Sequence, residues 1–320
     1  MKTLVVGGAG YVGSTLGRHL WKHGHDITVL DRLTFGAESL DELAGKDRFR
    51  LVPGDLRDDA LLNETLPGHD AVVLLAAIVG EPACNRDPAE AVEINQHGSI
   101  KVLAAAKAAG VERFVFSSTC SNYGVADTGQ LVTEEAPLQP ISTYSETKVA
   151  AETAILDSGT DGFCPTVLRL STAFGISPRM RFDLMVSDFT LAAFREKKIV
   201  VFGEQFWRPF VHVEDISLAV RMVLEAPVST VHGNVFNVGA NDANVRKIDL
   251  AEMIQRLVPG TELEFVKRDV DPRSYRVDFA KIEQQLGFRS QWTIEDGIEE
   301  LHTALRDGVW PDPSDKRYYN

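Results

Sequence analysis

The feature that most constrains the fold is a glycine-rich turn near the start of the chain. Gly7-Gly8-Ala9-Gly10-Tyr11-Val12-Gly13 directly follows an apolar run at 4–6 and opens a helical pattern over 12–23. In such a turn Gly7 permits the tight bend, Gly10 lets the backbone approach a pyrophosphate, and Gly13 lets helix and strand pack closely. The free N–H groups and the dipole at the start of the helix favour an anion. The spacing therefore predicts a strand–turn–helix unit that binds a dinucleotide.

An acidic residue at the end of the next strand-like run indicates which dinucleotide. Asp31 follows the run at 27–30, 18 residues after Gly13. A carboxylate at this place accepts the ribose hydroxyls of NAD and repels the 2′-phosphate of NADP. Arg32 weakens the discrimination, because an arginine beside the acid can bind that phosphate. We expect a preference for NAD, with use of NADP left open.

Short apolar runs alternate with helical patterns through the first half of the chain. Strand-like runs lie at 4–6, 27–30, 49–52, 71–75 and 114–117, and helical patterns lie between them at 12–23, 60–66 and 99–109. A helix near 143–157 and a strand near 166–170 continue the alternation. Strands that are apolar on both faces indicate a parallel sheet covered by helices on both sides. The expected fold class is α/β, a doubly wound parallel-sheet Rossmann fold with a smaller C-terminal α/β domain.

The pattern changes after Gly175. A breaker at 176–179 precedes a helix at 182–196, a strand at 199–202, a helix at 215–224 and a strand at 235–238, and the remainder reads as helix, strand and helix. Without a visible linker, we expect two domains that exchange segments. Residues 1–175 form the dinucleotide-binding domain and receive segments near 206–238, while 176–205 and 239–320 form a smaller substrate-binding domain.

Composition argues against several other classes of protein. The 33 Lys and Arg residues against 46 Asp and Glu residues give a net charge of −13, which disfavours nucleic acid and acidic membranes as partners. The longest uncharged apolar run, 71–80, is about half of a bilayer span. Three scattered cysteines, Cys84, Cys120 and Cys164, match neither a disulfide framework nor a metal site. The chain starts in an apolar strand without a charged leader, so we expect a cytoplasmic, metal-free protein.

Several motifs together carry a family resemblance. The Gly-x-x-Gly-x-x-Gly spacing combined with Tyr144-Ser145-Glu146-Thr147-Lys148 resembles the extended short-chain dehydrogenase/reductases, specifically the NAD-dependent nucleotide-sugar epimerase/dehydratase group. The similarity runs from residue 1 to about 300 and includes the segments 54–57, 75–77, 92–95, 116–124 and 207–215. The resemblance implies NAD as cofactor and these residues as its binding set: Gly7, Gly10, Tyr11, Val12, Gly13, Asp31, Arg32, Asp55, Leu56, Leu75, Ala76, Ala77, Asn95, Ser117, Tyr144 and Lys148.

Tyr144 and Lys148 suit the oxidation of an alcohol. The hydroxyl must lose its proton to a base while its hydride goes to nicotinamide, and a free phenol, with a pKa of about 10, is a poor base at neutral pH. A lysine four residues along lies on the same helix face, so Lys148 can stabilise the Tyr144 phenolate and reach the nicotinamide ribose. Thr119 would hold the substrate hydroxyl or the carbonyl that it becomes. The alternatives are an exposed helical Tyr–Lys pair and a threonine that only caps a strand.

The two residues after Thr119 bear on the reaction. In the 4,6-dehydratases that this chain resembles, an Asp-Glu pair follows the threonine and eliminates water, whereas Cys120 and Ser121 stand here. Neither is a carboxylic acid, so the expected reaction is oxidation at C4 of a nucleoside-diphosphate sugar followed by 4-epimerisation. A 4-dehydrogenase or 4-ketoreductase comes second and a 4,6-dehydratase third. A dinucleotide-sensing binding protein and a ketoreductase for apolar polyketide or steroid substrates are the rivals from other classes.

Arginines in the second half are expected on the substrate side. Arg208 and Arg268 match the pair that clamps the nucleotide diphosphate in the epimerases, where each guanidinium makes forked hydrogen bonds. Arg179, Arg181, Arg273 and Arg276 are either further pocket residues or solvated surface. The expected substrate contacts are Thr119, Cys120, Ser121, Thr172, Arg179, Arg181, Arg208 and Arg268.

Some positions depart from the family pattern or have plainer roles. Thr172 stands where the family often has Asn, and the loop at 78–82 is shorter than in galactose epimerases and lacks their lysine, so the sugar pocket is expected to differ from theirs. Cys84 is expected to be an unreactive thiol, and Asp215 to cap the helix that it begins. In the family, the helix matching 102–109 and the one bearing Tyr144 form a four-helix dimer seam, which implies a homodimer.

Overall fold

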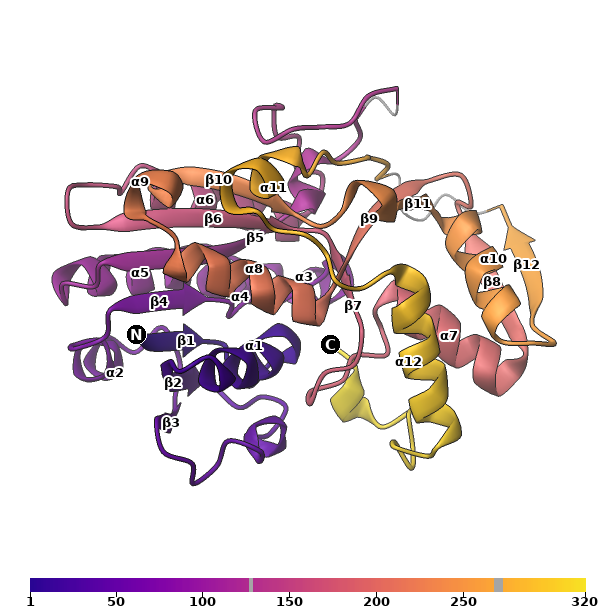
Figure 1. Cartoon of the computed structure of the whole chain (residues 1–320), viewed down its shortest axis with the longest axis horizontal. Helices are drawn as coiled ribbons and strands as arrows, with labels where there is room; N and C mark the ends of the chain where they lie inside the picture. Colours follow the sequence, from indigo (N-terminus) through magenta and orange to yellow (C-terminus); the bar gives the residue numbers. More distant parts are fainter. Residues whose placement is uncertain (127–128, 268–272) are drawn as a thin grey trace.

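A seven-stranded parallel sheet forms the centre of the protein, whose computed structural model describes residues 1–126, 129–267 and 273–320 (Figure 1). The strand order is β10-β6-β5-β4-β1-β2-β3, and all neighbours are parallel. The strands are β1 (Lys2–Val6), β2 (Asp26–Asp31), β3 (Phe49–Pro53), β4 (Ala71–Leu74), β5 (Arg113–Thr119), β6 (Cys164–Leu170) and β10 (Asn234–Val238). From β1 the chain adds β2 and β3 on one side of the sheet and β4 on the other, so the strand order reverses at β1. Sheets of this kind bind ligands in the crevice at the carboxyl ends of the strands where the order reverses. The expected doubly wound sheet is confirmed.

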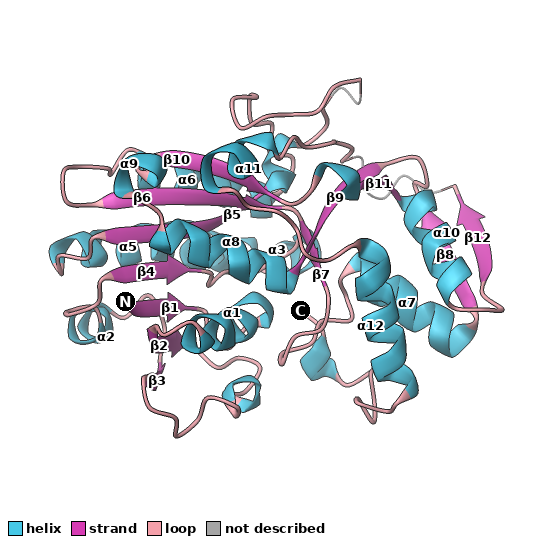
Figure 2. Ribbon diagram, viewed as in Figure 1, coloured by secondary structure: helices cyan, strands magenta, loops and turns pink. Residues whose placement is uncertain are grey.

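Helices cover both faces of this sheet (Figure 2). One face carries α1 (Tyr11–Lys22), α8 (Val213–Glu225), α9 (Val228–Val231) and α11 (Ala280–Leu286). The other carries α2 (Asp59–Thr65), α3 (Glu81–Arg86), α4 (Pro88–Val92), α5 (Ser99–Ala108) and α6 (Thr143–Leu156), with a π-helical segment, Glu93–Gly98, between α4 and α5.

Burial on both sides explains why the central strands are apolar at nearly every position. Val5 of β1 and Val73 of β4 pack under α1 and α8, whereas their neighbours Leu4 and Val72 pack under α2, α5 and α6. Because side chains alternate between the two faces of a strand, both sets must be apolar. The sheet is thereby fixed between two apolar layers, and only its edges and strand ends meet solvent or ligands.

A smaller assembly lies beyond the carboxyl ends of the strands and closes the crevice (Figure 1, right). In it β9 (Trp207–His212) pairs in parallel with β7 (Thr172–Phe174) and antiparallel with β11 (Asn244–Arg246), and β8 (Lys198–Phe202) pairs in parallel with β12 (Glu262–Val266). Three helices share its apolar core: α7 (Met185–Glu196), α10 (Lys247–Leu257) and α12 (Ile294–Arg306).

The boundary between the two assemblies differs at one place from the expected one. Segment 280–288 was expected in the smaller domain, yet Ile282 and Phe288 are buried in the core of the large sheet. The reason is that α11 packs along β10, the last strand of that sheet. The other expected domain limits stay a prediction.

Two local elements also differ from expectation. Residues 207–212 form β9, which no periodicity signalled because its neighbours β7 and β11 are remote in sequence. Helix α7 begins at Met185 instead of Phe182. Phe182 is buried against Trp310 and Tyr318, and its backbone N–H donates to the Tyr318 carbonyl at 3.0 Å. These contacts hold Phe182 in a loop, so the residues before Met185 do not join the helix.

Three general findings complete the fold. Within the described ranges, no helix is long and apolar enough to cross a membrane. The three cysteines are buried and unbridged. No group of three His, Cys, Asp or Glu side chains suited to a metal ion occurs among the same described residues.

Candidate active site

A cavity of about 900 Å³ opens at the carboxyl ends of the sheet strands. This volume is near the upper end of the range of roughly 300–1,000 Å³ that is usual for ligand sites. Its walls come from the turns after β1, β2, β4, β5 and β6, from the first turn of α6, and from segments of the smaller assembly. The cavity therefore lies at the crevice that the sheet topology indicates.

The glycine turn forms one wall of the cavity, and its geometry requires glycine. Gly7 has a φ of 88°, and a Cβ there would come within 2.5 Å of the Ala76 backbone nitrogen. A Cβ on Gly13 would lie 2.3 Å from the Gly7 carbonyl oxygen. Among the described residues no side chain caps the N-terminus of α1, which begins after Gly10. The start of α1 thus faces the cavity with room for a diphosphate on its N–H groups.

Asp31 and Arg32 lie beside this turn, at the end of β2. The Asp31 carboxylate accepts the backbone N–H of Ala9 at 2.9 Å and that of Leu33 at 2.8 Å, which fixes the loop after β2 against the turn. The Arg32 guanidinium donates to Glu90 at 3.0 Å and lies 4.0 Å from Asp55. Two carboxylates therefore offset its charge, which lessens its attraction for a 2′-phosphate. The arrangement fits NAD better than NADP.

Nearly all of the other expected cofactor residues line the same cavity. These are Gly10, Tyr11, Val12, Asp55, Leu56, Leu75, Ala76, Ala77 and Ser117. Asp55 is held by a fork from Arg57, with N–H donors at 2.9 and 2.6 Å, and this hydrogen-bonded pair lowers the pKa of the carboxyl.

Asn95 is the exception among the expected cofactor residues. It is fully buried behind the cavity wall, where its amide accepts the N–H of Ile78 at 2.7 Å and donates to the carbonyl of the same residue at 3.0 Å. The expectation of a direct cofactor contact is corrected: Asn95 shapes the loop after β4. The Cys84 thiol also donates to the Ile78 carbonyl, and burial raises the pKa of this thiol.

Tyr144, Lys148 and Thr119 are brought together at the opposite wall. Ser142 and Ser145 form reciprocal capping contacts that start α6, so Tyr144 lies in its first turn and Lys148 one turn further. The Lys148 Nζ is buried 4.2 Å from the centre of the Phe116 ring. Thr119 ends β5 and accepts the backbone N–H of Ser121 at 3.1 Å.

The protonation of this pair differs from the expected pattern. Burial raises the pKa of Tyr144 to about 12, although the charges of Arg181 and Arg273 lower it in part. Burial likewise lowers the pKa of Lys148 to about 7. In the protein alone desolvation opposes both charged forms and so works against the phenolate that Lys148 is expected to stabilise; that role of Lys148 stays a prediction.

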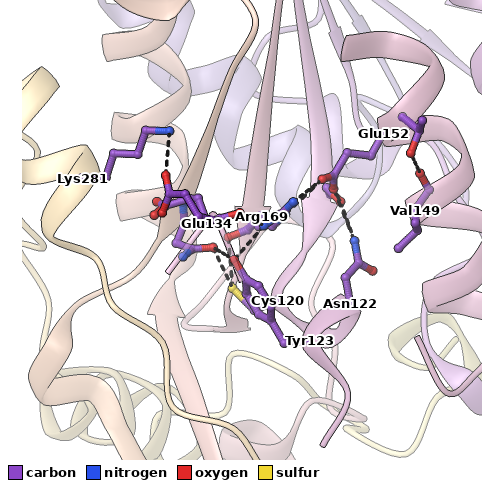
Figure 3. A network of polar contacts seen from close by, with 12 residues as sticks. Cys120, Asn122, Tyr123, Glu134, Val149, Glu152, Arg169 and Lys281 are labelled. Atoms are coloured by element: carbon purple, nitrogen blue, oxygen red, sulfur yellow. Dashed lines mark hydrogen bonds and ion pairs between the residues drawn. The ribbon is translucent and has the colours of Figure 1, made fainter. Parts of the chain in front are cut away.

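A buried ion pair behind the cavity wall joins the segments that bear Tyr144, Lys148 and Thr119 (Figure 3). Arg169 of β6 donates two N–H groups to one Glu152 oxygen of α6, at 3.0 and 2.6 Å. The second Glu152 oxygen accepts from Ser118 at 2.5 Å and from Asn122 at 3.3 Å, and Arg169 also donates to the Tyr123 hydroxyl at 2.9 Å. The pair thus joins α6, which bears Tyr144 and Lys148, to the end of β5, which bears Thr119.

On the substrate side, the cavity is lined by Thr119, Ser121, Thr172, Arg179, Arg181 and Arg208 as expected. Arg208 donates to the carbonyls of Trp207 and Arg273, so its fork is held at the wall. Arg268 lies outside the described residues. Cys120 does not face the cavity: it is buried behind it and its thiol donates to the Arg169 carbonyl at 3.2 Å. That expected substrate contact is corrected, since β5 turns into a 3₁₀-helix, Cys120–Tyr123, just before it.

Two cavity residues, Tyr275 and Asp188, were not singled out from the sequence. Tyr275 lies 3.4 Å from the Ser121 hydroxyl, measured between their oxygens. Asp188 has a pKa raised to about 6 by burial. Both belong to no motif, so no sequence signal could have found them. Of the two arginines left open between pocket and surface, Arg273 lines the wall, while Arg276 is absent from it and lies over Trp207.

Asp215 has a role that differs from the expected helix cap. His212 is the N-cap of α8, since its ring accepts the N–H of Glu214 at 3.2 Å. The Asp215 carboxylate instead accepts from the Ser290 hydroxyl at 2.5 Å and from the backbone N–H of Gln291 at 2.9 Å. Asp215 therefore ties the segment before α12 to α8.

Comparisons with known proteins give a consistent picture. The model of the NAD dependent epimerase/dehydratase family matches residues 3–239. A low-salt glycan biosynthesis protein, Agl12, of Haloferax volcanii is 33% identical, covering 93% of this chain and 96% of that protein. A UDP-glucose 4-epimerase of Corynebacterium glutamicum is 31% identical, covering 96% and 93%. The crystal structure of DesIV, a dTDP-glucose 4,6-dehydratase of Streptomyces venezuelae with NAD and TYD bound, is 25% identical with a TM-score of 0.86, covering 100% and 99%.

The buried ion pair leads to a prediction about stability. Replacing Glu152 by Ala leaves the Arg169 charge buried without its partner, which costs about 3–5 kcal/mol of unfolding free energy. Urea unfolding measures this loss. Glu146→Ala, at an exposed position of the same helix, is the matched control and should change stability by less than about 0.5 kcal/mol. A loss below about 1 kcal/mol for Glu152→Ala would contradict the role given to the pair.

Proposed function

Because the chain belongs to the NAD dependent epimerase/dehydratase family of extended short-chain dehydrogenase/reductases, whose members are NAD-dependent enzymes acting on nucleotide sugars, we propose that it is a nucleoside-diphosphate-sugar 4-epimerase. The observation that carries the proposal is one cavity lined by the glycine turn, by Tyr144, Lys148 and Thr119, and by Ser121, two residues after the threonine. The turn fits a dinucleotide, and the three side chains fit an alcohol to be oxidised.

The chain's own residues divide the chemistry. Tyr144 takes the proton of the sugar hydroxyl, and Thr119 holds the oxygen by a hydrogen bond while it changes from alcohol to carbonyl. Bound NAD supplies the hydride acceptor and a positive charge, and that charge favours the phenolate of Tyr144. Lys148 lies one helical turn from Tyr144, and its pKa, lowered by burial to about 7, lets it hold or release a proton at neutral pH.

Ser121 favours epimerisation over dehydration. Elimination of water across C5 and C6 needs an acid and a base beside the sugar, and the hydroxyl of Ser121 is neither at neutral pH. Its partner Tyr275 has a pKa raised by burial, so it is not a base either. The second candidate is a 4-dehydrogenase or 4-ketoreductase, which needs the same Tyr144, Lys148 and Thr119 and differs in releasing the reduced or oxidised cofactor.

Substrate recognition in this proposal relies on arginine. Arg208 and Arg181 line the cavity and suit a diphosphate, because a guanidinium offers several N–H donors in one plane. An apolar polyketide or steroid would remove water from these guanidinium groups without offering them hydrogen-bond acceptors. Which sugar and which base are accepted depends on loop 78–82 and on Thr172, where the chain departs from the galactose epimerases.

Product analysis tests the proposed function directly. With a panel of UDP- and dTDP-sugars, we expect a product of unchanged mass and inverted C4, with no net reduction of added NAD. Mass spectrometry, proton NMR and absorbance of reduced nicotinamide measure these outcomes. Loss of two hydrogens with accumulating NADH would establish the dehydrogenase, and loss of water would overturn the inference from Ser121.

Replacing Tyr144 by Phe tests the base. We expect kcat to fall by about 10²–10⁴-fold while the affinity for NAD stays within about twofold, since only the proton acceptor is lost. Steady-state kinetics and calorimetric titration with NAD measure the two quantities. Tyr318→Phe is the control, because Tyr318 packs against Phe182 and does not line the cavity. Activity of Tyr144→Phe close to that of the unaltered protein would rule out Tyr144 as the base.

We also propose that the protein is a homodimer formed through α5 and α6. The two helices pack side by side, and their outward positions carry small side chains, Ala104, Ala108, Ala150 and Ala154, which allow close helix approach. Light scattering should give twice the chain mass of 35.2 kDa. A mass of one chain at micromolar concentration would refute the dimer.

A further inference from the structure

Arg179 is buried at the cavity wall without an anionic partner. Only 5% of its surface is exposed, yet among the described residues its Nε has no hydrogen-bond partner. Its Nη2 donates a hydrogen bond to the Tyr319 carbonyl at 3.3 Å. The nearby carboxylate of Asp183 is taken by Arg181, which donates to both of its oxygens at 3.0 and 2.5 Å. Of these two buried guanidinium groups, only Arg181 makes hydrogen bonds to Asp183 among the described residues, and both groups line the cavity.

The position of Arg179 is set by contacts with the cofactor side of the cavity. The Ser177 hydroxyl donates to the Tyr11 carbonyl at 2.6 Å, and the Tyr11 hydroxyl donates to the Gly175 carbonyl at 2.6 Å. These bonds hold the segment before Arg179 against the first turn of α1. The glycine turn and Arg179 therefore line the same cavity, joined through Tyr11.

Phe35 fixes the orientation of the guanidinium. Its ring centre lies 3.8 Å from the Arg179 Cζ, and it belongs to the loop after β2 that Asp31 holds by accepting the Leu33 N–H. An aromatic face attracts a guanidinium without using its N–H donors. Stacking on Phe35 thus leaves the in-plane donors of Arg179 available to an anion.

We propose that Arg179, stacked on Phe35, binds the diphosphate of NAD and completes an anion site that the start of α1 begins. An unpaired buried cation is costly, and a diphosphate between it and the helix N-terminus offsets that cost. The expected substrate contact of Arg179 is thereby reassigned to the cofactor. Arg181, whose fork is held by Asp183, keeps its expected substrate contact as a prediction.

The diphosphate contact itself does not depend on which reaction the protein catalyses, so it stands or falls separately from the proposed function.

Calorimetric titration of nucleotide-free protein tests the proposal. Arg179→Gln removes the charge at similar length, Arg179→Lys keeps the charge without the fork, and Arg306→Gln, exposed on α12, is the matched control. The ligands are NAD, ADP, adenosine and UDP. We expect Arg179→Gln to weaken NAD and ADP about 10- to 100-fold and to leave adenosine and UDP unchanged, with partial recovery in Arg179→Lys. The control should match the unaltered protein.

Each other outcome overturns the proposal. Unchanged affinity for NAD and ADP would show that Arg179 does not contact the cofactor diphosphate. A loss for UDP alone would return Arg179 to the substrate, and an equal loss for adenosine would mean a general distortion of the site. Thermal unfolding without ligand separates folding from binding: Arg179→Gln should melt at or above the temperature of the unaltered protein, because it relieves buried repulsion, and a clearly lower melting temperature would assign Arg179 a structural role.

Discussion

The ion pair between Glu152 and Arg169 is the interaction on which the site geometry depends. It lies in the layer directly behind the cavity and joins α6 to β6, with Ser118 and Asn122 drawn in by the same carboxylate. Burying two charges is unfavourable unless every donor and acceptor is used, and here nearly all are. A shift of α6 relative to β6 would therefore break these hydrogen bonds. The distance between Tyr144 and Thr119 is therefore set by groups that never meet a ligand.

Desolvation governs the electrostatics of the cavity. Tyr144 and Lys148 are both driven toward their neutral forms, while the arginines keep their charge because their intrinsic pKa is far higher. The cavity wall thus places charged arginines beside a neutral acid–base pair. A ligand that brings negative charge to the arginines and positive charge to the phenol matches this distribution, and a bound NAD together with a diphosphate-bearing sugar has both features.

Local sequence patterns predicted much of the fold and of the cofactor side. Gly7, Gly13 and Asp31 act through backbone geometry and strand ends, which a short motif determines, and the Tyr144–Lys148 spacing follows from one helical turn. These patterns do not predict the direction in which a side chain points. Cys120 and Asn95 follow the family pattern in sequence, but the turn of the chain at each position directs the side chain behind the wall. The pKa of Tyr144 could not be predicted either, because burial arises from the smaller assembly, which is remote in sequence. For the same reason β9 gave no signal: its partners lie about 35 residues away on each side.

The position of α11 has a consequence for how such a protein can vary. Because α11 and β10 return to the large sheet after the chain has visited the smaller assembly, neither part is a continuous stretch of sequence. The smaller assembly therefore cannot be replaced by cutting and joining the chain at a single position, as a domain in a tandem array can. New substrate preferences are more accessible through the loops that project into the cleft, such as 78–82 and 176–184, which can be remodelled while the crossings stay intact.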